Sequence, residues 1–154
     1  MISPDFNDVV RANHKRLRFI ARRYGGAAHE DDVYQEVLLQ LWRSFNSFRG
    51  ESNRTTWIYR IGLNAALMWQ RKESSIRWVS NSELPEVSTP HGQCQGSVLE
   101  DFFDSLNEID SMILMMHLDD IDVSEVAEVI GISVNAVHIR INRLKQKFNA
   151  RYVD

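Results

Sequence analysis

Apolar side chains recur at helical spacing along almost the whole chain, and this pattern constrains the fold more than any other feature. The apolar residues lie three or four positions apart, which places them on one face of an α-helix. No stretch alternates apolar and polar residues convincingly, as a half-buried β-strand does. Helices are predicted over about residues 3–24, 30–46, 56–72, 98–103, 109–117, 123–130 and 133–151. The sequence therefore predicts an all-α protein.

Local signals set the ends of the first helix and the inward faces of the next two. Ser3 is a suitable N-cap, Pro4 is tolerated at the first helical position, and Gly25-Gly26 ends this helix. The apolar stripes of the two following helices are expected to face the core. Their members are Val33, Val37, Leu38, Leu41, Trp42 and Phe45, then Trp57, Ile58, Ile61, Ala65 and Met68.

Residues 74–96 break the helical pattern. Ser, Pro, Gly, Asn and Gln dominate this stretch, and its few apolar residues show no helical period. We interpret it as a flexible linker that joins two small helical domains. The domains are predicted to span residues 1–73 and 97–154.

Charge is distributed unevenly, although the net charge is only −3. Residues 1–75 carry twelve basic and eight acidic side chains, residues 76–120 carry one and nine, and residues 121–154 carry five and four. Basic ends around an acidic middle are compatible with two separate nucleic-acid contacts. An ordinary solvated surface explains the first segment about as well.

Three features indicate the compartment. No apolar run approaches the roughly 20 residues that a membrane-spanning helix needs. Residues 1–5 lack the charged-then-apolar pattern of a secretory signal. The single cysteine, Cys94, cannot form an internal disulfide, which fits a reducing environment. We expect a cytoplasmic protein with no membrane insertion of its own.

Residues 123–147 carry the pattern of a helix-turn-helix. Ala127 is small where two helices must cross, Gly131 permits the positive φ of a tight turn, and Ser133 is a natural N-cap for the second helix. That helix has five basic residues and no acidic one between Ser133 and Arg151, which favours phosphate binding. It is predicted to enter the major groove of DNA. The alternative is a structural hairpin whose basic face is simply solvated.

Three motifs in the first domain carry a family resemblance. Residues 31–42 read DDVYQEVLLQLW, residues 48–52 read FRGES, and residues 56–64 read TWIYRIGLN. In this order and spacing they resemble bacterial RNA polymerase sigma factors of the sigma-70 family, extracytoplasmic-function group. The turn around Gly131 resembles the C-terminal domain of the same family. The resemblance covers about residues 6–72 and 97–151, and it implies a transcription initiation factor that binds core RNA polymerase and promoter DNA.

The resemblance implies three binding surfaces. One helix face of the first domain would bind core polymerase through Asp32, Gln35, Glu36, Gln40 and Arg43. The spacing of these residues also suits the solvated face of an amphipathic helix. The following loop and helix would melt and read the −10 element through Phe48, Gly50, Glu51, Ser52, Asn53, Arg60, Asn64 and Arg71. The second helix of the helix-turn-helix would read the −35 duplex through Ser133, Asn135, His138, Arg140, Asn142, Arg143 and Lys147.

The chain departs from the family pattern in both domains. Arg54 stands where the family usually has an aromatic residue, and Ile139 stands where a small polar residue is usual. Asn135-Ala136 replaces a common Gly-Thr pair, so the resemblance leaves the base preference at −35 open. Members of the family are often held inactive by an anti-sigma factor, and such a partner is expected here.

Two other functions were weighed against this one. A helix-turn-helix regulator that is not a polymerase subunit would need a ligand pocket, a phosphoacceptor or a dimer helix, and residues 1–75 suggest none of them. A metal enzyme would draw on His29, Asp31, Asp32 and Glu36. No second ligand cluster and no Gly-rich phosphate loop accompanies these residues. We therefore expect a protein that is not an enzyme and that carries no metal or cofactor.

Overall fold

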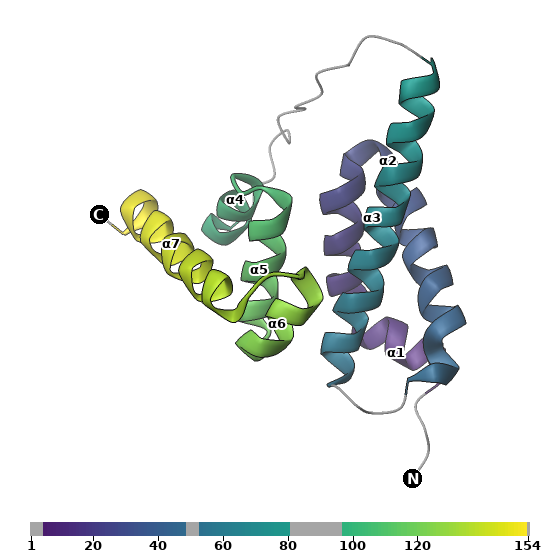
Figure 1. Cartoon of the computed structure of the whole chain (residues 1–154), viewed down its shortest axis with the longest axis horizontal. Coiled ribbons are helices and arrows are strands. Elements are labelled where there is room, and N and C mark those ends of the chain that lie inside the picture. Colours follow the sequence, from purple (N-terminus) through teal and green to yellow (C-terminus); the bar gives the residue numbers. More distant parts are fainter. Residues whose placement is uncertain (1–4, 49–52, 81–96, 154) are drawn as a thin grey trace. The chain divides into compact units, whose positions relative to one another are not determined.

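The structure is a computed structural model that describes residues 5–48, 53–80 and 97–153. Every regular element within these ranges is a helix, which confirms the all-α prediction. The chain divides into two compact units, Met1–Ser82 and Glu83–Asp154. In Figure 1 the first unit runs from purple to teal and the second from green to yellow.

The helix predicted over residues 3–24 is interrupted in the structure, where it forms a short helix, α1, and the first part of a long one, α2. The predicted start at Ser3-Pro4 lies outside the described residues; α1 spans Phe6–Ala12 and α2 spans His14–Ser44. Between them Asn13 leaves the helical conformation, with φ −116° and ψ 13°. Its side chain is buried, donates to the Val9 carbonyl at 2.8 Å and accepts from Arg16 at 2.8 Å. An asparagine that bonds to the backbone of the preceding turn competes with helix continuation, and this was not visible in the apolar spacing.

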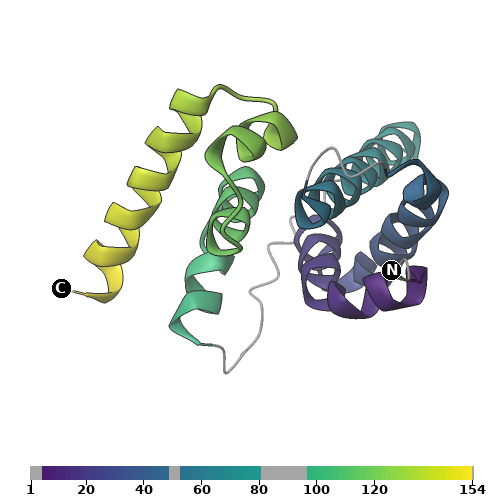
Figure 2. The ribbon, with the colours of Figure 1, turned by 90° about the horizontal axis from the view of Figure 1, so that it is seen from below.

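Gly26 divides α2 into two arms. Its φ of 66° and ψ of −177° are values that a residue with a Cβ rarely adopts, so the helix turns sharply there and resumes without a loop. The predicted helix end at Gly25-Gly26 is confirmed in this sense. Figure 2 shows the two arms and α3 as three neighbouring rods, with α1 across one end.

The core of the first unit forms where both arms of α2 meet α3. The first arm contributes Leu17 and Ile20, the second Val33, Val37 and Leu41, and α3 contributes Ile58, Tyr59 and Ala65, all at most 1% exposed. The four-residue spacing of Val33, Val37 and Leu41 keeps them on one side of the second arm. Gly62 of α3 is buried, and a Cβ there would lie 3.0 Å from the Ile20 Cδ1 atom, so α3 packs very closely on the first arm.

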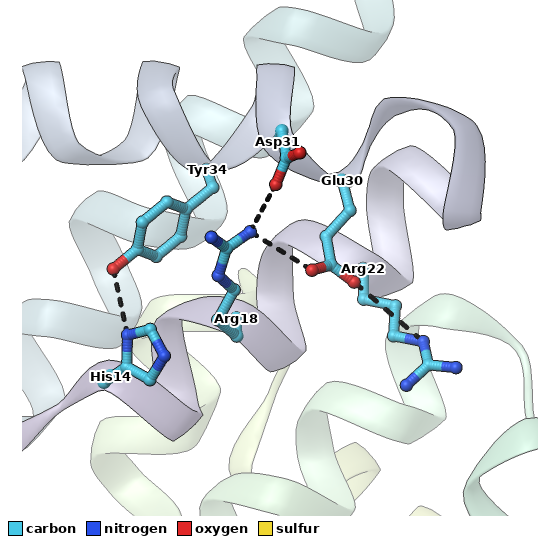
Figure 3. Close-up of polar contacts among 6 residues, drawn as sticks. All are labelled: His14, Arg18, Arg22, Glu30, Asp31 and Tyr34. Atoms are coloured by element: carbon cyan, nitrogen blue, oxygen red, sulfur yellow. Dashed lines mark hydrogen bonds and ion pairs between the residues drawn. The ribbon is translucent and has the colours of Figure 1, made fainter. Parts of the chain in front are cut away.

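Arg18 connects the two arms of α2, as Figure 3 shows. Its Nη1 atom donates to Asp31 at 2.7 Å and to Glu30 at 3.1 Å, and its guanidinium carbon lies 3.9 Å from the Tyr34 ring centroid. The hydrogen bond to Asp31 raises the pKa of Arg18 above its usual value. A hydrogen bond of 3.2 Å joins the Tyr34 hydroxyl to His14 on the first arm. These contacts fix the angle between the arms.

α3 is longer than predicted. It spans Arg54–Ser80, beyond the expected end at Lys72 and into the first part of the expected linker at residues 74–96. No Gly or Pro occurs between Lys72 and Ser80, so polar composition alone does not end the helix there. The rest of the expected linker, residues 81–96, lies outside the described residues.

The second unit contains the predicted helix-turn-helix. Its helices are α4 (Val98–Asp104), α5 (Glu108–Leu118), α6 (Val123–Ile130) and α7 (Val134–Tyr152). α6 ends at Gly131, whose φ of 86° and ψ of 31° are left-handed, and Ser133 caps α7 by accepting from the Ala136 N–H at 3.1 Å. Both features confirm the predicted turn.

The other end of α7 is held against α4. The rings of Phe102, Phe148 and Tyr152 pack together with centroid separations of 5.0–6.1 Å. The Tyr152 hydroxyl donates to Asp101 at 2.5 Å, and this hydrogen bond raises the pKa of Tyr152. α7 is thereby anchored at both ends, which leaves its outer face available.

Candidate protein- and nucleic-acid-binding surfaces

The second arm of α2 presents the face that was predicted to bind polymerase. Asp32, Gln35 and Arg43 are exposed on it, while Glu36 and Gln40 are half-buried. The Gln40 amide donates to the Glu36 carboxylate at 3.2 Å, and the His29 Nδ1 atom lies 3.6 Å from the Asp32 Oδ2 atom. The three- and four-residue spacing of the five predicted residues places them on one side of the arm. We call this surface the α2 face.

Two large apolar residues also belong to the α2 face. Leu39 is 40% exposed and falls among Asp32, Gln35, Glu36 and Arg43 by helical spacing. Trp42 is 61% exposed, so the expectation that it faces the core is wrong. It follows the buried Leu41 by one position, which turns it about 100° away from the core. Its ring packs edge-to-face with that of Phe6 of α1, at a centroid separation of 5.1 Å.

The predicted −10 residues of α3 also lie along one side of their helix. Asn64 and Arg71 are exposed and Arg60 is half-buried. Met68 was expected to face inward but is 43% exposed, between Asn64 and Arg71 by spacing. Trp57, also expected in the core, is half-buried at the start of the same side. We call this surface, formed by Trp57, Arg60, Asn64, Met68 and Arg71, the α3 face.

Aromatic and cationic groups stack beside the start of the α3 face. The Phe48 and Trp57 rings lie 5.0 Å apart, and the Arg54 guanidinium lies 5.6 Å from the Phe48 centroid, within cation–π range. Arg54, which departs from the family pattern, therefore still packs on an aromatic ring. Asn53 accepts from the Thr55 N–H at 3.1 Å and helps to begin α3. Gly50, Glu51 and Ser52 lie outside the described residues.

On α7 the predicted −35 residues fall into two groups. Asn135, His138, Asn142, Arg143 and Lys147 are exposed, and Ser133 is exposed while it caps the helix. Arg140 is half-buried and bonds to Asp110 of α5 at 2.8 Å, so its charge is directed toward the protein. Ile139, which is 44% exposed, lies among the exposed polar residues. We call Asn135, His138, Ile139, Asn142 and Arg143 the α7 face.

Sequence reasoning missed the exposed apolar residues of the α2 and α3 faces. Leu39, Trp42 and Met68 look like core residues by type, and only their angular position relative to the buried residues reveals their exposure. The metal site considered from the sequence as an alternative is not supported. Within the part of the chain that the structure describes, no group of three or more His, Cys, Asp or Glu residues is placed to hold an ion. Within the same residues, no helix is long and apolar enough to cross a membrane.

Comparison with protein families matches both units. The Sigma-70 region 2 model matches residues 9–76, and the Sigma-70, region 4 model matches residues 98–148. The sigma-E factor of Escherichia coli, an ECF RNA polymerase sigma factor, is 30% identical over 90% of this chain and 81% of its own length. The chain belongs to the ECF RNA polymerase sigma factors. The sigma-E factor of Haemophilus influenzae is 28% identical over 92% of this chain and 84% of that protein.

Solved structures support the fold of this sigma factor. The sigma factor RpoE of Bartonella quintana, solved with the anti-sigma factor NepR, superposes with a TM-score of 0.71 at 16% identity over 95% of both chains. CnrH, solved with the cytosolic domain of CnrY, gives a TM-score of 0.59 at 22% identity over 94% of this chain and 85% of that one.

Family membership confirms what the three sequence motifs and the helix-turn-helix predicted. This sigma factor is a promoter-specific initiation factor whose partners are core RNA polymerase and promoter DNA. The α2 and α3 faces lie within the region 2 match, and the α7 face lies within the region 4 match. The roles of the individual residues on these faces stay predictions.

Proposed function

We propose that this sigma factor docks on core RNA polymerase through the α2 face, holds the opened −10 strand on the α3 face and reads the −35 duplex with the α7 face. One observation supports this division of roles above others. Each face is one side of a helix whose other side packs in the core, and each carries several exposed side chains that a partner can reach without unfolding.

The composition of the α2 face suits a protein partner. Leu39 and Trp42 provide exposed apolar area, and charged and amide side chains surround them. Protein interfaces typically have such an apolar centre with a polar rim, and tryptophan is enriched among the residues that dominate binding energy. Asp32 and Glu36, one turn apart, supply negative charge for basic groups on the polymerase.

The α3 face suits single-stranded DNA. Arg60 and Arg71 provide positive charge for phosphates, and the Asn64 amide offers both a donor and an acceptor to an unpaired base. Arg54, Phe48 and Trp57 form an aromatic and cationic cluster at one end of this face, with the two rings inclined by 45°. Bases that leave the duplex stack favourably on such aromatic surfaces.

On the α7 face we assign the direct DNA contact to Arg143 rather than to Arg140. Arg143 is exposed, whereas Arg140 is paired with Asp110 and supports the position of α7 on α5. The exposed amides of Asn135 and Asn142 and the ring of His138 supply further hydrogen-bonding groups. Lys147 is exposed beyond them and is assigned to a phosphate.

The remaining expectations follow from this role. We infer that the sigma factor acts in the cytoplasm, where core polymerase and the chromosome are, and that it is not an enzyme and needs no cofactor. An anti-sigma factor that covers the α2 face would block polymerase binding. Support for such a partner comes from the sigma factor RpoE of Bartonella quintana, which was solved in complex with the anti-sigma factor NepR.

Competition for core polymerase tests the proposal. Trp42→Ala is expected to weaken binding by about 2 kcal/mol, the threshold for a dominant interface residue. Asp32→Lys/Glu36→Lys should also weaken it. The matched control is Glu100→Lys/Asp104→Lys, which reverses two exposed acidic residues at the same spacing on α4. If both double variants compete equally well, the assignment of the α2 face is wrong. If the unaltered chain binds promoter duplex but never core polymerase, the protein is a regulator of another kind.

A further inference from the structure

Ile139 interrupts an otherwise polar face. Its neighbours on the α7 face, Asn135, Asn142 and Arg143, stand four, three and four positions away and are all exposed. The buried residues of α7 include Val137 and Ile141, each two positions away, so Ile139 points away from the core. It is 44% exposed. The second unit therefore leaves nearly half of this residue uncovered.

Exposure alone does not make Ile139 unusual. Ile109 of α5 is also 44% exposed, and single exposed aliphatic residues are common on protein surfaces. The position of Ile139 is what distinguishes it. It lies at the centre of the face that meets DNA in the proposed function, on a helix with no acidic residue between Ser133 and Arg151.

An isoleucine in the major groove has one favourable partner among the base edges. It forms no hydrogen bonds, and against the amino and carbonyl groups of the bases it would displace water without replacing the lost hydrogen bonds. The C5-methyl group of thymine is the apolar feature that the major groove presents. Contact between this methyl and the branched isoleucine side chain removes apolar surface from water on both sides.

We propose that Ile139 is a specificity-determining residue that packs on a thymine methyl in the −35 element. This rests on the proposed function of the α7 face. Ile139 requires an A·T pair at the position it covers, with the thymine on the strand that faces it. The bracketing polar residues Asn135, Asn142 and Arg143 then read the adjacent pairs by hydrogen bonds.

The test uses core polymerase reconstituted with the full chain. A preferred −35 duplex is selected from a randomised library, and each thymine in it is then replaced in turn by deoxyuridine, which removes only the methyl group. We expect one replacement to weaken binding about fourfold, as for one buried methyl group. Ile139→Ala should weaken binding to the unmodified duplex by a similar or larger factor and should be insensitive to the same replacement. Ile109→Ala, which alters an equally exposed isoleucine, should behave like the unaltered chain.

Three results would overturn the inference while leaving the proposed function intact. The first is a selected element that lacks an invariant A·T pair. The second is that none of the deoxyuridine replacements weakens binding. The third is that one replacement weakens binding equally for the unaltered chain and for Ile139→Ala. In each case the unaltered holoenzyme still prefers the selected duplex to a scrambled one. If it shows no such preference, the proposed role of the α7 face fails as well, and the inference fails with it.

Discussion

Arg140 of α7 donates from its Nη1 atom to the Oδ1 atom of Asp110 on α5, at a distance of 2.8 Å. The Asp110 side chain is only 13% exposed. The backbone N–H of Asp110 donates to the Asn107 Oδ1 atom at 2.8 Å. This ion pair joins the helix that is proposed to enter the groove to the helix behind it. It therefore sets the position of the α7 face rather than adding to it.

Removing either member of this pair should destabilise the second unit. Arg140→Gln and Asp110→Asn are each expected to lower the free energy of unfolding by about 1 kcal/mol, because Arg140 is partly exposed and solvent weakens the pair. The double variant should lose less than the two single losses combined, since both disrupt one interaction. Far-UV circular dichroism is the suitable probe, because all four tryptophans lie before residue 83 and fluorescence does not report on this unit.

Arg143→Gln is the matched control for this cycle. Arg143 is exposed three positions further along α7, so its replacement should leave stability within about 0.5 kcal/mol of the unaltered chain. Strictly additive losses from Arg140→Gln and Asp110→Asn would show that the pair contributes nothing in solution.

Arg18→Ala should loosen the two arms of α2. The variant loses two ion pairs and the contact with the Tyr34 ring, and because these groups are partly exposed the expected loss in unfolding free energy is about 1 kcal/mol. Tryptophan fluorescence during urea unfolding measures it, since all four tryptophans lie in the first unit. Core polymerase binding should weaken too, because the second arm carries the α2 face.

Two comparisons make the Arg18 prediction specific. Arg18→Lys keeps the charge but loses the planar guanidinium that contacts both Asp31 and the Tyr34 ring, so it should recover only part of the stability. Lys15→Ala removes an exposed basic residue from the same arm and should have little effect. A loss for Lys15→Ala equal to that for Arg18→Ala would indicate a general charge effect instead.

Gly131→Ala should destabilise the helix-turn-helix through the backbone alone. Gly131 has a φ of 86°, and no atom lies within 4 Å of the position a Cβ would take. The cost is therefore that of holding alanine in the left-handed region, about 1 kcal/mol. Gly131→Asn should cost less, because asparagine adopts this conformation more readily. Circular dichroism melting measures both, and equal stability of all three proteins would contradict the prediction.

The sequence was sufficient for features that depend on local chemistry. The turn at Gly131, the cap at Ser133 and the break at Gly26 each need a particular residue type, and each occurs where it was predicted. The three ordered motifs of the first domain were likewise sufficient for the family.

Features that depend on tertiary geometry were not predictable in the same way. Trp42 belongs to the apolar pattern of α2, but only the direction of α3 packing shows that it lies outside the core. Arg140 and Arg143 are equivalent by charge and spacing, and the position of Asp110 on another helix separates their roles. The Asn13 break depends on a side-chain hydrogen bond to Val9, which the hydrophobic periodicity does not contain.

The two DNA contacts should fail at different steps of initiation. Arg143→Ala is expected to weaken recruitment that depends on the −35 duplex. A bidentate contact to a base edge would cost about 1–3 kcal/mol of discrimination at one position. Loss of a phosphate contact would instead weaken binding to all DNA sequences alike. It would also lower, by about one unit, the slope of the logarithm of the binding constant against the logarithm of the salt concentration. The variant should still transcribe from a template whose −10 region is already open, because the α3 face is unchanged.

Asn64→Ala should show the opposite behaviour. Asn64 lies on the α3 face in the first unit, so recruitment to the −35 duplex should persist while opening at −10 is reduced. Permanganate reactivity of unpaired thymines near −10 reports this step directly, and it should fall for Asn64→Ala while remaining normal for Arg143→Ala once enough holoenzyme is supplied. Met68→Ala, at an exposed position on the same face, tests whether apolar contact contributes to holding the strand. If Arg143→Ala and Asn64→Ala both block the same step, the two faces do not act separately.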